Sequence, residues 1–325
     1  MRTRLNTRPN TRLSDRPGTS PQQLPHVPAA PIVAGVDGAG RSASAVVWAA
    51  DEAEHTDRSL RLISAYTEHG RARDGQRPSE PELARLGRRL AFADLECRVE
   101  AGSAPDVLVA AAADASLLVV GRRGLGTAHR LMVGSTSVAV AGRAPVPVVV
   151  VPEQWMQPTM ASAPVVVGID AGDLTDRLPA DERDDEVLEF GFARADDLRV
   201  PLIAVSAWTV PALYSWSPTD IAACRDRYTD ALERRLAGWR ERYPNVEVVA
   251  RSVAGPPADA ILDALKVAQV AVIGRHADRR RHALRLGSTA RDVLHHAERP
   301  VVVVPAPRPT SVEPSAAAYD WAPMF

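Results

Sequence analysis

The chain has 325 residues, a length that exceeds one small domain and suits two domains that each bury a core. Its formal net charge of −1 argues against a dedicated nucleic-acid-binding protein, because such proteins usually carry a strong basic excess. The two cysteines, Cys97 and Cys224, form no CxxC pattern and are typical of reduced thiols. No apolar stretch approaches the ~20 residues that a membrane crossing needs, and the basic N-terminus lacks the apolar core of a secretory signal. We therefore expect a cytoplasmic protein with neither nucleic acid nor membrane as a partner.

Both ends of the chain are polar and rich in proline. Residues 1–30 and 306–325 show no hydrophobic period, so they are expected to be disordered tails. Between them, short apolar runs alternate with stretches of helical periodicity. In the first half the predicted strands are Ile32–Asp37, Leu60–Tyr66, Leu95–Glu100, Leu117–Val120 and Val146–Val151. The predicted helices are Ser44–Thr56, Glu82–Leu90, Asp106–Ala113 and Thr136–Ala141.

The second half repeats this order. Val165–Asp170 matches Ile32–Asp37, and Asp220–Tyr243 has the pattern of a longer helix than its counterpart. An acidic segment is also inserted after Asp170, with Asp173, Asp176, Asp181, Glu182, Asp184 and Asp185. We predict one domain over 31–152, a linker over 153–163 and a second domain over 164–305. The alternation favours an α/β fold built from βαβ units, with a mainly parallel sheet and right-handed crossovers in each half.

A glycine motif follows the apolar run Leu117–Val120. It consists of Gly121-Arg122-Arg123-Gly124, nine intervening residues, and Gly134-Ser135-Thr136 at the start of a predicted helix. The free N–H groups and the positive dipole end of such a helix suit a phosphate, and Arg122 or Arg123 could add charge. Asp37, at the end of the first strand, would stand at the same sheet edge. Each feature alone is more often a simple turn or cap, but their convergence on one edge indicates a ligand site.

The sequence contains no recognised catalytic set beside this motif. It has no GxGxxG fingerprint, no Walker lysine and no GxSxG elbow. The histidines show no metal-binding spacing. We therefore expect no dedicated catalytic site and no metal centre built from protein side chains.

The complete G-x2-G-x9-G-[ST] motif, the strand-one aspartate and the duplication resemble tandem-domain members of the universal stress protein family. The resemblance covers both predicted domains and implies an α/β fold of two open, mostly parallel, five-stranded, Rossmann-like sheets in tandem, with helices on both faces. Many members bind ATP, and no established enzymatic role is implied. In the first domain Asp37 would lie near the nucleoside and the backbone around Ala65 would meet the adenine. The residues implied to hold the ribose and phosphates are Gly121, Gly124, Gly134, Ser135 and Thr136.

The second copy of the motif departs from the first. Ala277 stands where Gly124 stands, and the acidic insertion would repel a polyphosphate if it covered the site. Arg275 and the run Arg279–Arg281 could offset that repulsion, although such a run is more often a solvated loop. The residues of this second, weaker site are Asp170, Ala207, Gly274, Gly287, Ser288 and Thr289. We expect ATP, with or without Mg2+, to bind mainly to the first domain.

The last strands, Val146–Val151 and Val301–Val304, are nearly pure valine. An apolar strand at a sheet edge needs a cover, and the resemblance implies that last strands pair. They would do so as an intramolecular pseudo-dimer or in a homodimer.

Three functions remain: an ATP-binding stress-response regulator, a nucleotide-free scaffold, and a nucleotide hydrolase or transferase. The lack of a clear base, metal cluster or phosphate-binding lysine disfavours the third.

Overall fold

The computed structural model describes residues 29–37, 40–67, 94–122, 135–157, 162–170, 184–208, 218–275 and 286–305. The strands are β1 (Ile32–Gly35), β2 (Leu60–Tyr66), β3 (Leu95–Ala101), β4 (Leu117–Arg122), β5 (Val148–Pro152), β6 (Val165–Gly168), β7 (Leu202–Trp208), β8 (Val248–Ala254), β9 (Val270–Gly274) and β10 (Val301–Val304). The helices are α1 (Ala43–His55), α3 (Ala104–Ala111), α4 (Ser135–Arg143), α5 (Asp185–Leu198), α6 (Pro218–Arg242), α7 (Pro257–Leu265) and α8 (Ser288–His296), with a short 3₁₀ turn at Ala112–Asp114.

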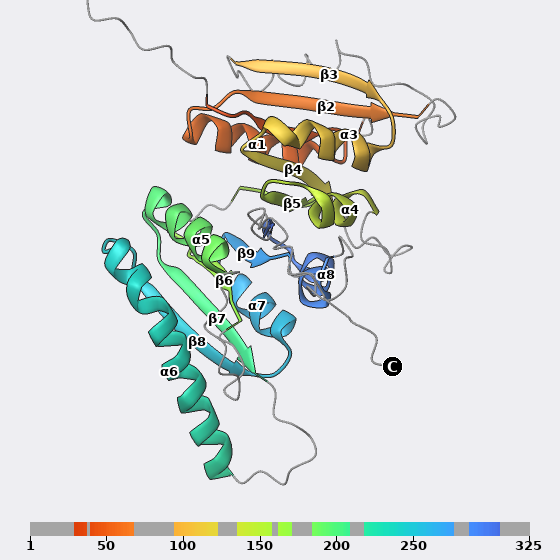
Figure 1. The fold of residues 1–325 in the computed structure, drawn as a ribbon. Helices are drawn as coiled ribbons and strands as arrows, with labels where there is room; N and C mark the ends of the chain where they lie inside the picture. Colours follow the sequence, from red (N-terminus) through yellow and green to blue (C-terminus); the bar gives the residue numbers. More distant parts are fainter. Residues whose placement is uncertain are drawn as a thin grey trace, which may run out of the picture.

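All of these strands belong to one ten-stranded sheet in the order β3-β2-β1-β4-β5-β10-β9-β6-β7-β8 (Figure 1). Each half is parallel throughout. In the first half β1 lies between β2 and β4, so the strand order reverses at β1, and β6 occupies the same place in the second half. The predicted α/β architecture with two parallel halves is therefore confirmed, and each half has a topological switch point.

The two halves join through their last strands. β5 and β10 run antiparallel, with Val150 opposite Val301 and Val149 opposite Val302. This confirms the predicted intramolecular pairing. On its other side β5 pairs with β4 and β10 pairs with β9, so neither strand offers an open edge for the alternative homodimer contact. The valines of both strands are buried because helices cover both faces of the sheet, which is where continuous apolar strands are stable.

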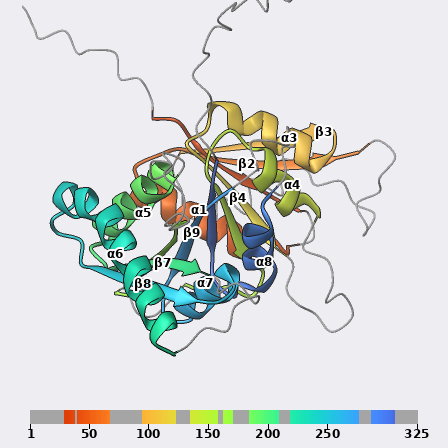
Figure 2. The same cartoon turned by 60° about the horizontal axis from the view of Figure 1, so that its bottom comes forward.

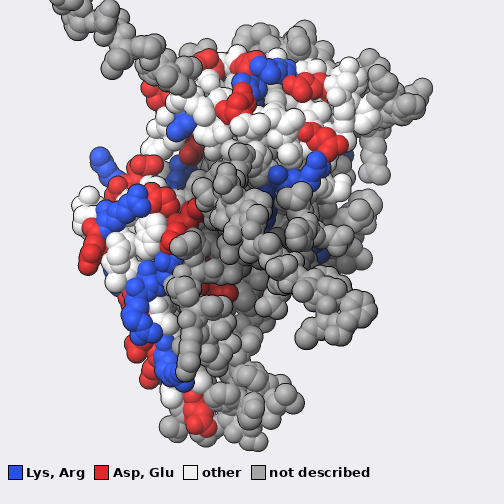
Figure 3. Space-filling model, viewed as in Figure 1, with Lys and Arg blue, Asp and Glu red and all other residues white. Residues whose placement is uncertain are grey.

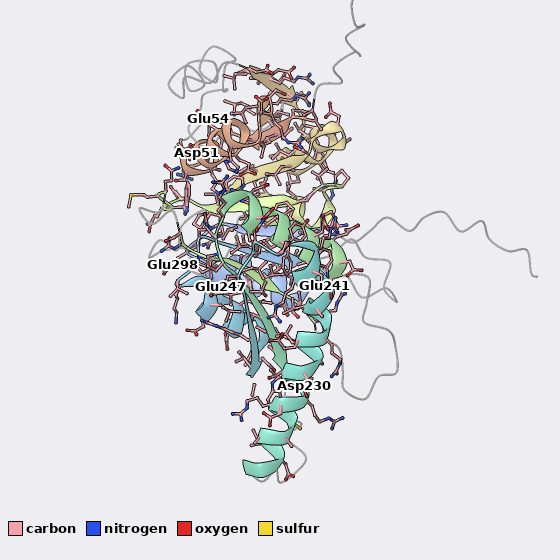
Figure 4. The ribbon with its side chains drawn as sticks, turned by 90° about the vertical axis from the view of Figure 1, so that its left-hand side faces the viewer. Asp51, Glu54, Asp230, Glu241, Glu247 and Glu298 are labelled. Atoms are coloured by element: carbon pink, nitrogen blue, oxygen red, sulfur yellow. The ribbon has the colours of Figure 1, made fainter. Side chains whose placement is uncertain are left out.

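The helices form two layers. One core cluster joins the sheet to α1, α5 and α6, and a second joins the opposite face to α3, α4, α7 and α8 (Figure 2). On α1 the residues at the predicted helical spacing, Ala45, Trp48, Ala49 and Glu52, are all buried. Helix α6 also matches its prediction and buries Leu232 and Leu236. Figure 4 shows that the amino-terminal part of α6, on the far side of Asp230 from Glu241, extends away from the body of the molecule.

The sequence prediction was wrong about the start of α5. Asp184 and Asp185 were assigned to the acidic insertion, but Asp185 begins a 14-residue helix whose apolar face buries Leu188 and Phe192. Acidic residues in the first turn of a helix interact favourably with its dipole, so they are as consistent with a helix start as with a loop. The other four acidic residues, the predicted helix Glu82–Leu90 and most of both predicted tails lie outside the described residues.

Charge is mixed on the surface that Figure 3 shows. Among the described residues on this face, arginines and acidic residues alternate, above all along α6, without a large patch of one sign. Within the described part of the chain, no helix combines the length and the apolar character that a bilayer crossing requires.

Candidate functional site

Asp37 lies two residues beyond β1, at the switch point of the first domain. Its Oδ1 accepts hydrogen bonds from the backbone N–H and the hydroxyl of Ser42, both at 3.0 Å. Its own backbone N–H donates to the Ser42 Oγ at 3.1 Å. Ser42 directly precedes α1 and is 4% exposed, whereas Asp37 is an exposed residue. These bonds hold an accessible carboxylate at the carboxyl edge of the sheet, where open α/β sheets bind ligands.

Gly121 lies opposite this turn, at the end of β4. A Cβ on Gly121 would lie 3.4 Å from the Cα of Ser42 and 3.6 Å from the carbonyl oxygen of Arg41. Both distances are ordinary van der Waals contacts, so the end of β4 packs closely against the turn before α1. The family resemblance assigned Gly121 to the ribose and phosphates, and its position beside this turn was not anticipated. Sequence reasoning also missed Ser42, although a serine directly before a helix is a recognisable signal.

Two further predicted elements belong to the same edge. Gly35 pairs with Ile63, and continuing this parallel register by two residues brings Ala65 level with Asp37. Ser135 and Thr136 form the first turn of α4, so their backbone N–H groups are at the end of the helix that favours anions. Gly124 and Gly134 lie outside the described residues. The described part of the first site thus comprises Asp37, Ser42, Ala65, Gly121 and the start of α4.

The second domain has an equivalent turn between its first strand and first helix, with one residue changed. The backbone N–H of Asp170 donates to Oδ2 of Asp184 at 2.8 Å. Asp184 precedes α5 as Ser42 precedes α1, and it is 2% exposed. A carboxylate thus replaces the serine hydroxyl, and it places a second acidic group behind Asp170. An ionised carboxylate has no hydrogen to donate, so the Asp184 side chain cannot repeat the hydrogen bond that the Ser42 hydroxyl donates to Asp37.

The remaining predicted residues of the second site lie at its sheet edge. Ala207 is near the end of β7, and Gly274 ends β9 beside β6. Gly287 caps α8, and Ser288 and Thr289 form its first turn, which confirms the predicted helix start. The backbone N–H of Gly287 donates to the carbonyl oxygen of Arg275 at 3.1 Å. Ala277 and Arg279–Arg281 lie outside the described residues.

Arg122 and Arg275 do not serve the sites for which they were predicted, and Arg123 lies outside the described residues. Arg122 is 5% exposed and donates from Nη1 to the carbonyl oxygen of His295 at 2.9 Å and from Nη2 to that of Ala297. Arg275 donates from Nη1 to the carbonyl oxygen of Ala144 at 2.8 Å. Both side chains reach the other domain, because β4 and β9 each lie one strand from the β5–β10 junction. Burial lowers the pKa of both guanidinium groups.

Metal-binding residues are not clustered in the parts of the chain that the structure describes. There, no three side chains of His, Cys, Asp or Glu lie close enough together to hold a metal ion. His295 and His296, two of the histidines that showed no metal spacing in the sequence, lie in the last turn of α8. Burial lowers the pKa of His295, and the neighbouring charges of His296 and Arg122 lower it further.

A family model described as the universal stress protein family matches the chain twice, at residues 29–152 and 164–305. The chain belongs to the universal stress protein family. Universal stress protein Rv1996 of Mycobacterium tuberculosis H37Rv is 30% identical over 316 residues, which cover 86% of this chain and 96% of the relative. Universal stress protein Rv2005c of the same strain is 30% identical over 291 residues, which cover 84% and 96%. The family assignment from the sequence motifs is thus confirmed for a tandem-domain member.

Two solved structures share the fold of most of the chain. A universal stress protein from Archaeoglobus fulgidus aligns with a TM-score of 0.61 at 16% identity, over 85% of this chain and 98% of its own. A Pseudomonas aeruginosa protein described as functionally unknown, PA1789, has the same TM-score and identity over 86% and 93%. At this identity the similarity establishes the fold alone.

Proposed function

We propose that this universal stress protein is a cytoplasmic stress-response regulator that binds an adenine nucleotide, mainly in its first domain. The observation that carries the proposal is the arrangement of Asp37, Ser42 and Gly121 at the switch point. It presents an exposed carboxylate, in a turn fixed by three hydrogen bonds, at the edge where an open α/β sheet receives a nucleoside. A carboxylate in that place suits the hydroxyl groups of a ribose.

The start of α4 complements this carboxylate. Ser135 is exposed and Thr136 half-buried, and the backbone N–H groups of the first helical turn have no partners within the helix. Phosphate oxygens satisfy such donors, and the helix dipole favours their charge. The two features together fit a nucleotide. If ATP binds as a magnesium complex, its phosphates would supply ligands to the ion.

The second domain is the weaker candidate because of Asp184. Its carboxyl group lies behind Asp170, where the first domain has a neutral hydroxyl. A second carboxylate near the edge repels an anionic ligand and competes for the same hydrogen-bond donors. We therefore place the nucleotide mainly at Asp37, with a weak second site or none at Asp170.

Binding without turnover is part of the proposal. Asp37 is engaged with Ser42, and the first site contains no other described side chain suited to activate water. A nucleotide would then act as a signal or as a structural ligand that changes the surface offered to partners. The alternative is a nucleotide-free scaffold, which the altered second site favours for that half of the chain.

A matched pair of variants tests the assignment. Asp37→Asn and Asp170→Asn make the same chemical change at equivalent positions of the two domains. Isothermal titration with ATP should show at least a tenfold loss of affinity for Asp37→Asn and less than a twofold loss for Asp170→Asn, with and without Mg2+. The reverse order would contradict the assignment to the first domain. Wild-type protein that releases no adenine nucleotide on denaturation and gains no melting temperature from ATP would support the scaffold instead.

A further inference from the structure

The two arginines that follow the first glycine of each motif make equivalent contacts across the domain junction. Arg122 follows Gly121 and donates to the carbonyl oxygens of His295 and Ala297, at the carboxyl end of α8. Arg275 follows Gly274 and donates to the carbonyl oxygen of Ala144, directly after α4. Each arginine of one domain thus reaches the helix that begins at the motif of the other domain.

The contacted groups are the orphan carbonyls of a helix end. The last carbonyl groups of an α-helix have no partner within the helix, and they carry the negative end of its dipole. A buried guanidinium satisfies these carbonyls and complements their charge. Helices α4 and α8 have nine residues each and are therefore about 13 Å long. An arginine that holds one end of such a short, rigid helix also sets the position of the other end.

The main chain of these arginines is tied to its own domain. The N–H of Arg275 donates to the carbonyl oxygen of Val304 at 2.9 Å, and its carbonyl oxygen accepts from Gly287 at 3.1 Å. The carbonyl oxygen of Arg122 accepts from the N–H of Glu153 at 2.8 Å. Arg275 therefore holds the amino end of α8 through its backbone and the carboxyl end of α4 through its side chain. Arg122 holds the carboxyl end of α8 from the other side.

These contacts link each motif to an arginine of the other domain, and we call this the crossed arrangement. We propose that Arg275 and Arg122 are positioning residues in trans: Arg275 sets the phosphate-binding end of α4 in the first domain, and Arg122 sets that of α8 in the second. Nucleotide affinity in the first domain then depends on an arginine of the second domain. The statement about affinity rests on the proposed function, whereas the statement about helix positions does not.

This arrangement predicts the opposite mutational result from a model in which each arginine acts on the motif of its own domain. If each arginine served the motif beside it, Arg122→Gln would weaken nucleotide binding in the first domain and Arg275→Gln would not. In the crossed arrangement, Arg275→Gln lowers ATP affinity about fivefold, a typical coupling between sites, and at least threefold more than Arg122→Gln does. Adenosine has no phosphate to contact α4, so its affinity should change less than twofold in Arg275→Gln.

Isothermal titration of the full chain with ATP and with adenosine measures both effects. Arg194→Gln is the matched control, because it removes a contact between the domains on the opposite face of the sheet, from Arg194 to Glu52. This control should leave the ratio of ATP to adenosine affinity unchanged. An Arg275→Gln variant with wild-type ATP affinity, or one that loses ATP and adenosine equally, would overturn the proposal.

Hydrogen exchange without nucleotide separates this inference from the proposed function. Arg275→Gln should speed amide exchange in α4 and Arg122→Gln in α8, each more than in the neighbouring α3 or α7. Exchange that rises only next to the substituted residue, or equally in all four helices, would overturn the positioning roles. If exchange follows the crossed pattern but the wild-type chain binds neither ATP nor adenosine, the proposed function fails while the positioning of the helices stands.

Discussion

Arg194 of α5 and Glu52 of α1 form an ion pair between the two domains. Nη1 of Arg194 lies 2.5 Å from Oε2 of Glu52, in an alignment outside hydrogen-bond geometry, and the two side chains are 16% and 10% exposed. The guanidinium also lies over the ring of Trp48, 5.7 Å from its centroid. This cluster joins the two domains on the face of the sheet covered by α1 and α5, and Arg122 and Arg275 join them on the opposite face.

Removal of one partner from this buried pair should be costly. Arg194→Gln leaves the largely buried Glu52 carboxylate without its counter-charge, so we expect a loss of about 3 kcal/mol in the free energy of unfolding. Urea denaturation measures it. The double variant Glu52→Gln/Arg194→Gln should recover part of this loss, because it leaves no uncompensated charge. A single variant within about 0.5 kcal/mol of wild type would contradict this account.

Substitution of Asp51 should stabilise the protein at neutral pH. Burial raises the pKa of Asp51, the nearby Glu54 raises it further, and Oδ2 of Asp51 is buried without a hydrogen-bond partner. Figure 4 shows the two residues close together on α1. Because the pKa is higher in the folded state, the contribution of Asp51 is most favourable below its unfolded pKa of about 4 and is lost as pH rises through the folded value.

Asp51→Asn removes this titration. The variant should gain a fraction of a kcal/mol at pH 7, since the group is partly exposed and solvent screens its charge. The gain should shrink as the pH falls toward 4, and thermal unfolding across that range measures it. Glu54→Gln should give a smaller gain of the same sign. A gain that grows on acidification would show that the sign is wrong.

Two helical glycines should respond in opposite ways to alanine. A Cβ on Gly191 of α5 would lie 2.3 Å from Cγ2 of Val167 in β6. Valine is stiff about χ1, so its side chain cannot rotate away to relieve this clash. Gly191→Ala should therefore cost about 2 kcal/mol despite the higher helix propensity of alanine. Gly238 of α6 has no atom within 4 Å of the added Cβ, so Gly238→Ala should gain about 0.5 to 1 kcal/mol. Chemical denaturation of both variants measures their free energies of unfolding, and so compares the cost of a steric clash at Gly191 with the gain in helix propensity at Gly238.

Exchange of the residues before α1 and α5 tests why the domains differ. Ser42→Asp gives the first domain the carboxyl group of the second and should lower ATP affinity at least tenfold. The melting temperature reports whether the fold survives, since Ser42 is buried and a charged side chain there carries a desolvation cost. The reciprocal Asp184→Ser should leave the first site unchanged and can only improve the second. Wild-type ATP affinity in a folded Ser42→Asp variant would argue that Asp184 does not explain the weaker second site.

The fold was predictable in outline because its signals are local. Alternating apolar runs and helical periods in each half, such as Val165–Asp170 and Asp220–Tyr243, are enough to predict parallel βαβ units. The start of helix α5 was assigned to the acidic insertion because Asp184 and Asp185 extend an acidic run, and composition alone does not separate a charged first turn from a loop.

The sequence by itself determined the duplication, the α/β class and the family motif with Asp37. All of these depend on residue type and spacing along the chain. Only the tertiary structure decided the direction of Arg122 and Arg275, the role of Ser42 and its replacement by Asp184. These contacts join segments that are distant in the sequence or belong to different domains, and a long guanidinium side chain beside a glycine motif can equally well reach a phosphate or a helix end.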